Sequence, residues 1–294
     1  MRRTLLPIAA LYTAACLTAN AQVLYSTGFE EFNTGSIVNQ FGWEQQLSSS
    51  GGRGDGSIVD NFARSGDKSL KITPISGTGI GSNWWWRFSP HDTNASPNKI
   101  IRIKWDMYLT TSSVQGAYGI DVYNGAGALT RVCSARVLEN NQVQLIYFEN
   151  GTATMISNLN LFAQRNRWNR FRMDIDYTTR TFKVYLNGVD VDPNGTYPIQ
   201  YSAGPVFGDA DVWFVNPDGT ANDSAYYDNY YVAAIRAVVD GDVNGDGCVD
   251  DADLLAVLFA FGSSGDCLDE DVNLDGAVDD ADLLAVLFNF GAGG

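Results

Sequence analysis

A short stretch near the C-terminus places oxygen-bearing side chains at alternating positions. Asp242, Asn244 and Asp246 occupy places one, three and five of this stretch, and a glycine follows at place six. Calcium takes six to eight oxygen ligands, and alternation in a tightly turned loop directs successive side chains at one centre. The glycine allows the sharp turn that such a loop needs. The spacing therefore predicts a calcium-binding loop.

The calcium-loop pattern occurs twice. DVNGDGCVDDADLLAVLFAFG from Asp242 and DVNLDGAVDDADLLAVLFNFG from Asp271 agree at 18 of 21 positions, with a spacing of 29 residues. Such a duplication predicts two similar units, each with its own calcium ion. The expected ligands are side-chain oxygens and, at place seven, a backbone carbonyl: Asp242, Asn244, Asp246, Cys248, Asp250 and Asp253 in the first loop, and Asp271, Asn273, Asp275, Ala277, Asp279 and Asp282 in the second.

An apolar segment follows each loop, at 254–261 and at 283–290. Each is long enough for a short helix but too short to bury its own apolar side chains. We expect the two helices to pack against each other in antiparallel fashion, which leaves part of their apolar surface for a partner. Acidic residues at the helix starts, such as Asp251 and Asp280, also favour the positive end of the helix dipole, so some carboxylates are useful even without a metal.

The order of loop then helix, repeated once, resembles a type I dockerin module. The aspartate at place twelve, Asp253 or Asp282, departs from the glutamate of the familiar EF-hand loop and agrees with dockerins. The resemblance covers about residues 240–291, within an expected module at 237–294. It implies calcium-dependent folding and docking to a cohesin-like protein outside the cell.

Acidic charge is concentrated in this module. From Asp240 onward there are 14 acidic residues and no lysine or arginine, in a chain whose net charge is −15. Like charges at this density repel one another in a compact state unless cations neutralise them. The rest of the chain is nearly balanced in charge, which argues against nucleic acid or an anionic membrane as a partner.

The N-terminus has the features of a secretory signal peptide over residues 1–21. Two arginines precede the apolar run 5–17, and Ala-Asn-Ala at 19–21 has the small-x-small form of a cleavage site. No other stretch approaches membrane-spanning length. We therefore expect a secreted protein, extracellular or at the cell surface, with no membrane span.

Export also makes a disulfide available, because oxidising compartments allow cysteines to pair. Removal of the signal peptide takes Cys16 away and leaves Cys133 in the middle of the chain, with Cys248 and Cys267 in the tail. We expect Cys248 and Cys267 to pair, closing a loop of about twenty residues that contributes roughly 3 kcal/mol. Cys133 should remain an unpaired, buried thiol.

Residues 22–236 show the two-residue period of β-strands. Ile101, Ile103 and Trp105, for example, alternate with Arg102 and Lys104. Such runs, about a dozen in number and separated by Gly, Asn, Asp and Ser, predict one large all-β sandwich. The segments with this pattern are 23–29, 69–73, 84–88, 101–107, 118–123, 129–138, 142–148, 171–177, 181–186, 211–215 and 225–235.

Several segments carry a family likeness. They are GFE from Gly28, SGDKSLKI from Ser65, WNRFRMDIDYTTRTFKVYLNG from Trp168 and YYDNYYV from Tyr226. Together they resemble concanavalin A-like, laminin-G-like jelly rolls. The fold class implied is a mainly β jelly-roll sandwich with a small all-α calcium-binding module at its C-terminus.

The opening GFE and the closing Asp-Asn at 228–229 also resemble galactose-binding-like carbohydrate modules, in which the corresponding acids can hold a structural calcium. By that resemblance Glu30 and Asp228 are candidate ligands of a further calcium site. The plainer interpretation is that both are ordinary acids at strand ends.

Three consecutive tryptophans, Trp84, Trp85 and Trp86, lie in one predicted strand. In a strand two of these indoles point to one face and the third to the other. Exposed aromatic rings bind sugars because the apolar face of a pyranose stacks on them, whereas tryptophans facing the inside of a sandwich fill its core. All three are therefore candidate carbohydrate-binding residues, with core packing as the alternative.

Enzyme chemistry has few candidates in this chain. His91 is the only histidine and lies in a turn-like segment, which gives no support to a Ser-His-Asp site and excludes a His-Glu-x-x-His zinc site. Glycoside hydrolysis needs only two carboxylates, and Glu44, Glu139 and Glu149 are available. The closely spaced Glu-x-Asp-x-Glu strand typical of jelly-roll glucanases is absent, while a lyase that uses tyrosine with lysine or arginine stays open.

We therefore expect a non-catalytic carbohydrate-binding or adhesive sandwich that a calcium-dependent module docks to another extracellular protein, in the use of extracellular polysaccharides. A glycan hydrolase or lyase on the same jelly roll is one alternative. A structural cell-surface protein is another. The glycan expectation follows from resemblance of fold, and a fold by itself does not establish a function.

Overall fold

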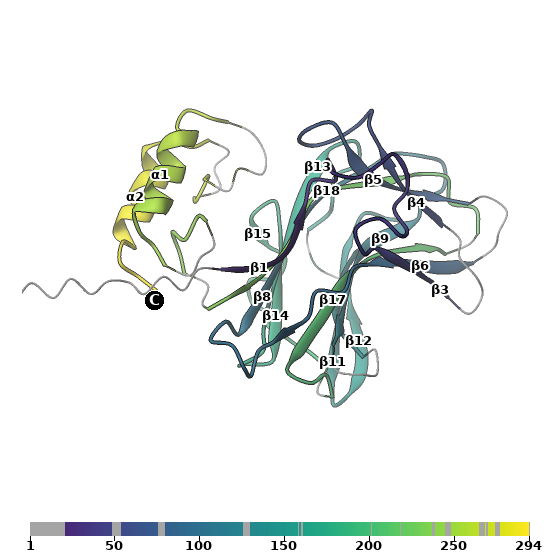
Figure 1. The fold of residues 1–294 in the computed structure, drawn as a ribbon, viewed down its shortest axis with the longest axis horizontal. Helices are drawn as coiled ribbons and strands as arrows, with labels where there is room; N and C mark the ends of the chain where they lie inside the picture. Colours follow the sequence, from purple (N-terminus) through teal and green to yellow (C-terminus); the bar gives the residue numbers. More distant parts are fainter. Residues whose placement is uncertain are drawn as a thin grey trace, which may run out of the picture.

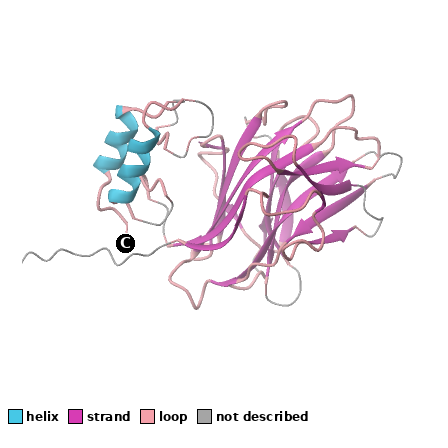
Figure 2. Ribbon diagram, turned by 45° about the horizontal axis from the view of Figure 1, so that its top comes forward, coloured by secondary structure: helices cyan, strands magenta, loops and turns pink. Residues whose placement is uncertain are grey.

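The computed structural model describes residues 21–48, 54–75, 80–125, 130–157, 159, 161–200, 202–217, 219–236, 239–244, 248–264, 268, 270–273 and 277–293. These residues form a mainly β structure with two short helices near the C-terminus (Figures 1 and 2). Neither helix is long and apolar enough to cross a membrane. The expected signal peptide at 1–21 lies outside the described residues except for Ala21.

The strands form two antiparallel sheets that pack face to face (Figure 1). One sheet runs in the order β15 (Val189–Asp190), β14 (Thr181–Leu186), β13 (Trp168–Asp176), β8 (Ile100–Leu109), β18 (Ala225–Ile235), β5 (Ser69–Pro74), β4 (Gly54–Val59) and β2 (Gly35–Ser36). β1 (Gln22–Thr27) also pairs with β18, and β16 (Tyr197–Pro198) pairs with β14. We call this the ten-stranded sheet.

The second sheet runs in the order β12 (Thr152–Ile156), β11 (Val143–Glu149), β10 (Arg131–Val137), β9 (Ala117–Asn124), β17 (Val206–Asn216), β6 (Gly81–Trp86) and β3 (Glu44–Leu47). β7 (His91–Asp92) also pairs with β17. We call this the eight-stranded sheet. The predicted jelly-roll β-sandwich is thereby confirmed.

Every strand segment predicted from the two-residue period overlaps an observed strand. Asn187 and Gly188 connect β14 to β15 with φ of 50° and 80°, and a type I′ hairpin turn requires such positive values. The prediction missed β2, β3, β4, β7, β12, β15 and β16. Except for β4, which has 6 residues, these strands have at most 5. β3 is exposed along its whole length, so no alternation of apolar and polar residues marks it.

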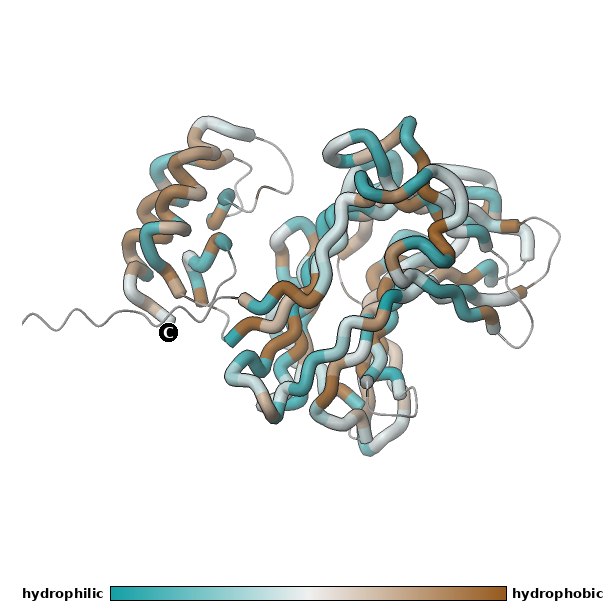
Figure 3. Tube along the Cα trace, in the orientation of Figure 1, coloured by the Kyte–Doolittle hydropathy of each residue, from teal (hydrophilic) through white to brown (hydrophobic). Residues whose placement is uncertain are grey.

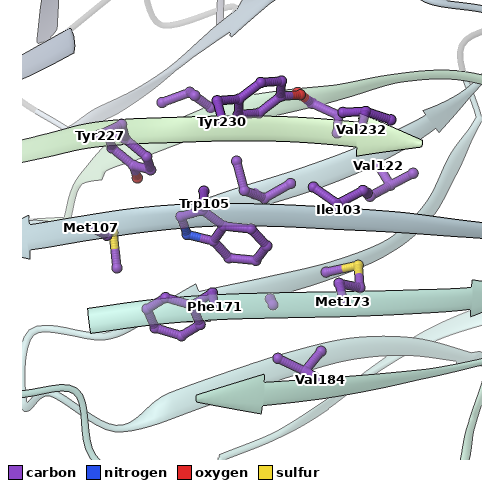
Figure 4. Close-up of a cluster of buried hydrophobic side chains, with 14 of the residues drawn as sticks. Ile103, Trp105, Met107, Val122, Phe171, Met173, Val184, Tyr227, Tyr230 and Val232 are labelled. Carbon is purple, nitrogen blue, oxygen red and sulfur yellow. The ribbon is translucent and has the colours of Figure 1, made fainter. Parts of the chain in front are cut away.

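The core lies between the two sheets and is built by the apolar face of each strand (Figure 4). Trp105 of β8 and Phe171 of β13 are register partners whose rings stack with centroids 5.0 Å apart. The polar residues that alternate with the core residues of these strands lie on the other face of the sheet and pair with one another. There Arg102 Nε donates to Asp174 Oδ1 at 2.8 Å. The alternation seen in the sequence thus separates core residues from ion pairs.

The C-terminal repeat forms two helices, α1 (Asp251–Ala260) and α2 (Asp280–Phe288). Backbone hydrogen bonds join the start of each helix to the end of the other: Val249 N donates to Ala292 O, and Val278 N donates to Ser263 O, both at 2.9 Å. The helices are therefore antiparallel, as expected from the sequence. Val257 and Val286 are fully buried between them.

Most of the apolar helix residues are exposed, which differs from the expectation that packing between the helices would bury them. One stripe of each short helix faces its partner, and the residues on the remaining faces have nothing to cover them. Phe259 and Phe288 are 87% and 84% exposed. The other exposed side chains of this set are Leu255, Leu258, Phe261, Leu284, Leu287 and Phe290. Both helices accordingly show as largely apolar in Figure 3.

Candidate functional sites

The three consecutive tryptophans divide between the two faces of β6. Trp85 is fully buried in the core, whereas Trp84 and Trp86 are half-buried on the opposite face of the eight-stranded sheet. β4 makes room for the core indole with glycine, because a Cβ on Gly56 would lie 2.5 Å from Trp85 Nε1. Of the three candidates for sugar binding, two remain available, and Trp85 is a core residue.

Trp84 and Trp86 line a pocket on the outer face of the eight-stranded sheet. Its volume is about 260 Å³. This is slightly below the ~300–1,000 Å³ common for pockets that hold drug-sized ligands, which suits a ligand about as large as one sugar ring. The lining residues are Gln46 of β3, Trp84 and Trp86 of β6, Tyr123 of β9, and Asp209 and Asp211 of β17. We call it the tryptophan pocket.

A hydrogen bond to a buried carboxylate holds the ring of Trp84 in place. Its Nε1 donates to Asp121 Oδ2 at 3.0 Å. Arg136 Nη2 donates to the same carboxylate at 2.6 Å, and its guanidinium lies 3.6 Å from the ring centroid of Trp213. Burial alone would raise the pKa of Asp121, but the charge and hydrogen bonds of Arg136, together with Arg131 and the hydrogen bond from Trp84, outweigh burial and hold that pKa below its ordinary value. A buried, ionised carboxylate thus fixes the orientation of one wall of the pocket.

The opposite wall carries two buried carboxyl groups without cationic partners. Asp209 and Asp211 are 3% and 6% exposed, and the Oδ1 atom of each has no hydrogen-bond partner. Burial raises the pKa of Asp209 to about 6, although a hydrogen bond with Asp211 lowers it. Burial, followed by repulsion from Asp209, raises the pKa of Asp211 well above its ordinary value. Both carboxyl groups therefore hold a proton more tightly than an exposed aspartate does.

Neither Asp209 nor Asp211 was predicted from the sequence. The available signal was a pair of aspartates two residues apart just before a predicted strand, since such residues share one face of a strand. Which face they share, and that Trp84 and Trp86 lie on the same face, follows from the pairing of β17 with β6: Val212 is the register partner of Trp85.

A larger pocket of about 830 Å³ lies elsewhere on the sandwich. It is lined by Phe148, Glu149, Asn150, Gly151, Arg180, Pro198, Ile199, Gln200 and Ser202. Arg180 Nη2 donates to the backbone carbonyls of Gln200 and Ala203 at 2.8 and 2.9 Å, so its guanidinium is already hydrogen-bonded to the protein backbone. Because this pocket has no pair of half-buried indoles, we regard the tryptophan pocket as the better candidate for sugar binding.

In the calcium-loop candidates, the carboxylates at place twelve are fully buried. Asp253 Oδ1 accepts hydrogen bonds from Val243 N and Asn244 N at 2.8 and 3.0 Å, and its Oδ2 accepts one from Asp250 N at 2.9 Å. Asp253 thus connects the start of the first loop to the start of α1.

The second loop repeats this arrangement. Asp282 accepts hydrogen bonds from Asn273 N and Asp279 N at 3.0 and 2.9 Å. Asp250 and Asp279 are the N-cap residues of the two helices, and each forms a capping box with the residue at place twelve.

The chemistry of these residues fits calcium. Asp253 and Asp282 are fully buried and Asp271 is 7% exposed, although the sequence offers no lysine or arginine in this module to neutralise them. A buried carboxylate needs a compensating charge, and hard oxygen donors are what calcium takes. Among the described residues no group of three His, Cys, Asp or Glu side chains is assembled as a metal site, and two predicted ligands, Asp246 and Asp275, lie outside those residues.

The structure describes six of the other predicted loop residues, whose role as calcium ligands stays a prediction. Asp242 and Asn244 lie at the start of the first loop, and Asp271 and Asn273 at the start of the second. Cys248 and Ala277, at place seven, each form one isolated β-bridge, to Gly293 and Ser264 respectively.

The cysteine predictions have different outcomes. Cys133 is a buried, unpaired thiol as expected, with its Sγ donating to Met173 Sδ at 3.7 Å and its pKa raised by burial. Cys248 is buried, while Cys267 lies outside the described residues. The Cys248–Cys267 disulfide therefore stays a prediction.

The two acids of the further calcium candidate contact the same loop. Glu30 Oε1 accepts hydrogen bonds from Asp67 N and Lys68 N at 3.0 and 2.9 Å. Asp228 Oδ2 accepts hydrogen bonds from Arg64 N and Ser65 N at 2.8 and 3.0 Å. Through these hydrogen bonds both carboxylates anchor the loop at 64–68.

Lys68 places its ammonium group beside Glu30. Its Nζ donates to the backbone carbonyls of Glu30 and Phe32 at 2.9 and 2.7 Å. An ammonium group thus already contacts carbonyl oxygens beside Glu30. The second calcium site at Glu30 and Asp228 stays a prediction, and the plainer interpretation accounts for these contacts.

The chain matches no protein-family model and no curated protein sequence. Solved structures that resemble it include a cellulose-induced protein, Cip1, at 12% sequence identity and a TM-score of 0.50, with 71% of this chain and 97% of that chain covered. A carbohydrate esterase of the Shiga toxin-encoding bacteriophage phi24B matches at 15% identity and a TM-score of 0.47, covering 73% and 99%. A mutant alginate lyase in complex with an alginate tetrasaccharide matches at 13% identity and 0.48, covering 74% and 98%. At these identities the likeness concerns the fold alone, and among these three the Cip1 match alone reaches a TM-score of 0.50.

Proposed function

We propose that this chain is an exported carbohydrate-binding protein whose sandwich holds a sugar ring in the tryptophan pocket. The observation that carries the proposal is the pocket itself, in which two half-buried indoles, Trp84 and Trp86, lie beside two buried carboxyl groups with unpartnered oxygens. Indole faces stack on the apolar face of a pyranose, and the carboxyl oxygens accept hydrogen bonds from its hydroxyl groups. The pocket thus offers both kinds of contact that a sugar ring needs.

The test is calorimetric titration of the full chain with a panel of neutral, acidic and amino oligosaccharides, repeated for Trp86→Ala. Removing a central aromatic contact costs roughly 2 kcal/mol, or about thirtyfold in Kd. Trp168→Ala is the matched control, since Trp168 is also half-buried but stacks on Phe62 at the other sheet, with centroids 5.6 Å apart. Equal losses of affinity in both variants would contradict the assignment, as would a chain that binds no member of the panel.

The C-terminal repeat completes the proposal as a calcium-binding docking module. Two calcium ions would neutralise the carboxylates of the loops, held by the residues predicted as ligands. Support comes from the buried Asp253 and Asp282 and from the apolar surface that α1 and α2 leave exposed. An exposed apolar surface of this kind favours a protein partner, and a cohesin-like extracellular protein is the partner that the dockerin resemblance implies.

The near-identity of the two copies makes a specific prediction about that partner. The exchange of α1 with α2 presents nearly the same surface, so a partner should accept either orientation. Asp251→Lys or Asp280→Lys alone should leave the affinity for the partner nearly unchanged, whereas the double variant should abolish binding. A large loss from one single variant and none from the other would show one fixed orientation.

A catalytic alternative is favoured by one observation, the raised pKa of Asp209. A carboxyl group that titrates near 6 is suited to general acid catalysis of glycan cleavage. Glycosidases, however, hold their two carboxyl groups about 5–9.5 Å apart, whereas Asp209 and Asp211 interact directly through a hydrogen bond. The lone His91 is buried, with its Nε2 3.0 Å from the carbonyl of Asn98. Binding is therefore the better supported function, and release of reducing or unsaturated ends from the bound glycan would establish catalysis instead.

A further inference from the structure

The tryptophan pocket presents hydrogen-bond acceptors that the protein leaves without donors. The Oδ1 atoms of Asp209 and Asp211 are both buried and without a partner. Asp209 and Asp211 also interact with each other through a side-chain hydrogen bond. Trp84 Nε1, a donor at the pocket wall, is already bonded to Asp121. A ligand that brings donors to this wall would satisfy these acceptors, and a buried acceptor left without a donor costs free energy.

The charges around the pair do not supply a cation either. Arg131 and Arg136 of β10 form their ion pairs with Asp121, at 3.6 and 2.6 Å. Within the described part of the chain, no basic side chain forms an ion pair with Asp209 or Asp211. When it is ionised, the pair holds negative charge in a small aromatic cavity and has no ion-pair partner among the described residues.

We propose that the tryptophan pocket selects hexosamine units with a free amino group, whose ammonium binds between Asp209 and Asp211 while the sugar ring stacks on Trp86. An ammonium brings three donors and no acceptor, which matches a wall that holds only acceptors. It also brings the missing positive charge, and the two indoles can add a cation–π attraction. The inference rests on the proposed function, since it names the class of sugar for the same pocket.

The same wall disfavours other sugars. The carboxylate of a uronic acid or the sulfate of a sulfated sugar offers acceptors and negative charge, so it would meet Asp209 and Asp211 with repulsion. A neutral hydroxyl supplies a donor but leaves the charge of the pair uncompensated. An N-acetylated hexosamine has only one amide donor and no charge. The amine should therefore bind more tightly than each of these.

The pH dependence follows from competition between the ammonium and protons for the two carboxyl groups. The groups around the pair are Asp121 and Tyr123 of β9, Arg131 and Arg136 of β10, Glu44 of β3, Arg87 after β6, and Tyr230 of β18 on the core side. An ammonium binds best when the pair is ionised. The affinity for the amine should therefore fall as the pH drops below 6, by about tenfold per pH unit, while the affinity for a neutral sugar should change little.

The test uses the full chain with calcium and three disaccharides: glucosamine dimer, N-acetylglucosamine dimer and cellobiose. Disaccharides are preferable to polymers, because a polycation would also bind the acidic C-terminal module. At pH 6.5 we expect the glucosamine dimer to bind at least roughly tenfold more tightly than cellobiose, as a charged hydrogen bond adds to affinity. In Asp209→Asn and in Asp211→Asn this ratio should fall close to one.

Two controls keep the test specific. Asp251→Asn removes a charge from the C-terminal module and should leave the ratio as in the parent chain; a ratio that falls in this variant would place the amine on the module and overturn the inference. Thermal unfolding of each aspartate variant shows that the sandwich is folded. If cellobiose binds as tightly as the amine, or if the ratio survives both pocket substitutions, the inference is wrong while the proposed function stands. If no sugar binds, both are wrong.

Discussion

The buried carboxyl pair should make the sandwich less stable at high pH, and Asp209→Asn should remove the part of this loss that Asp209 contributes. The pKa of Asp209 is raised from 3.8 to about 6, first by burial. A folded-state pKa above the unfolded value means that the folded protein holds the proton more tightly, so stability is present at low pH and is lost as the pH rises through 6. Two pKa units correspond to roughly 3 kcal/mol, of which roughly 2 kcal/mol falls between pH 4.5 and pH 8.

The assay is urea unfolding of the full chain at pH 4.5 and pH 8, followed by tryptophan fluorescence. All 7 tryptophans lie between residues 43 and 213, so this signal reports the sandwich and not the C-terminal repeat. Relative to the parent chain, Asp209→Asn should gain roughly 2 kcal/mol more at pH 8 than at pH 4.5. Comparing the two pH values cancels any effect of the amide that does not depend on pH.

Asp121→Asn is the matched control on the neighbouring strand. Asp121 is the register partner of Asp211. The pKa of Asp121 lies below the ordinary value, because its interactions with Arg136 and its other partners outweigh the effect of burial. Its contribution to stability is complete above the unfolded pKa, so Asp121→Asn should lose about the same free energy of unfolding at pH 4.5 and at pH 8. The reasoning is refuted if Asp209→Asn also shows the same difference from the parent chain at both pH values.

Three further predictions concern the core and the C-terminal repeat. Trp85→Ala should lower the free energy of unfolding by roughly 3–5 kcal/mol, measured by urea titration, because it empties a core site; a loss below 1 kcal/mol would contradict the core assignment. Residues 237–294 should gain helix when calcium is added, and Asp242→Ala with Asp271→Ala should abolish the gain; identical circular dichroism with calcium and with chelator would sink this prediction. Mass spectrometry of exported protein should find Cys248 bonded to Cys267, and two free thiols would contradict it.

The fold class and most strands followed from local pattern. Residues that alternate between apolar and polar in 101–107 and 171–177 became β8 and β13, because a half-buried strand imposes a period of two on its sequence. The strands that were not predicted lack this alternation of apolar and polar residues. β4 carries Gly54 where the ring of Phe214 leaves no room for a side chain, and Gly56 where the indole of Trp85 leaves none. This demand arises only once β4 lies against β17 and β6 of the other sheet.

The sequence by itself determined the calcium-loop pattern, since all its residues lie within a dozen positions of one another and repeat once. It also determined that one of the three tryptophans faces away from the other two. Only the tertiary structure decided which of them is buried and what surrounds the rest. Trp84, Tyr123 and Asp209 come together because β6, β9 and β17 are neighbours in one sheet, although they are far apart along the chain. Strand order depends on long-range pairing, which the periodic pattern within each strand does not specify.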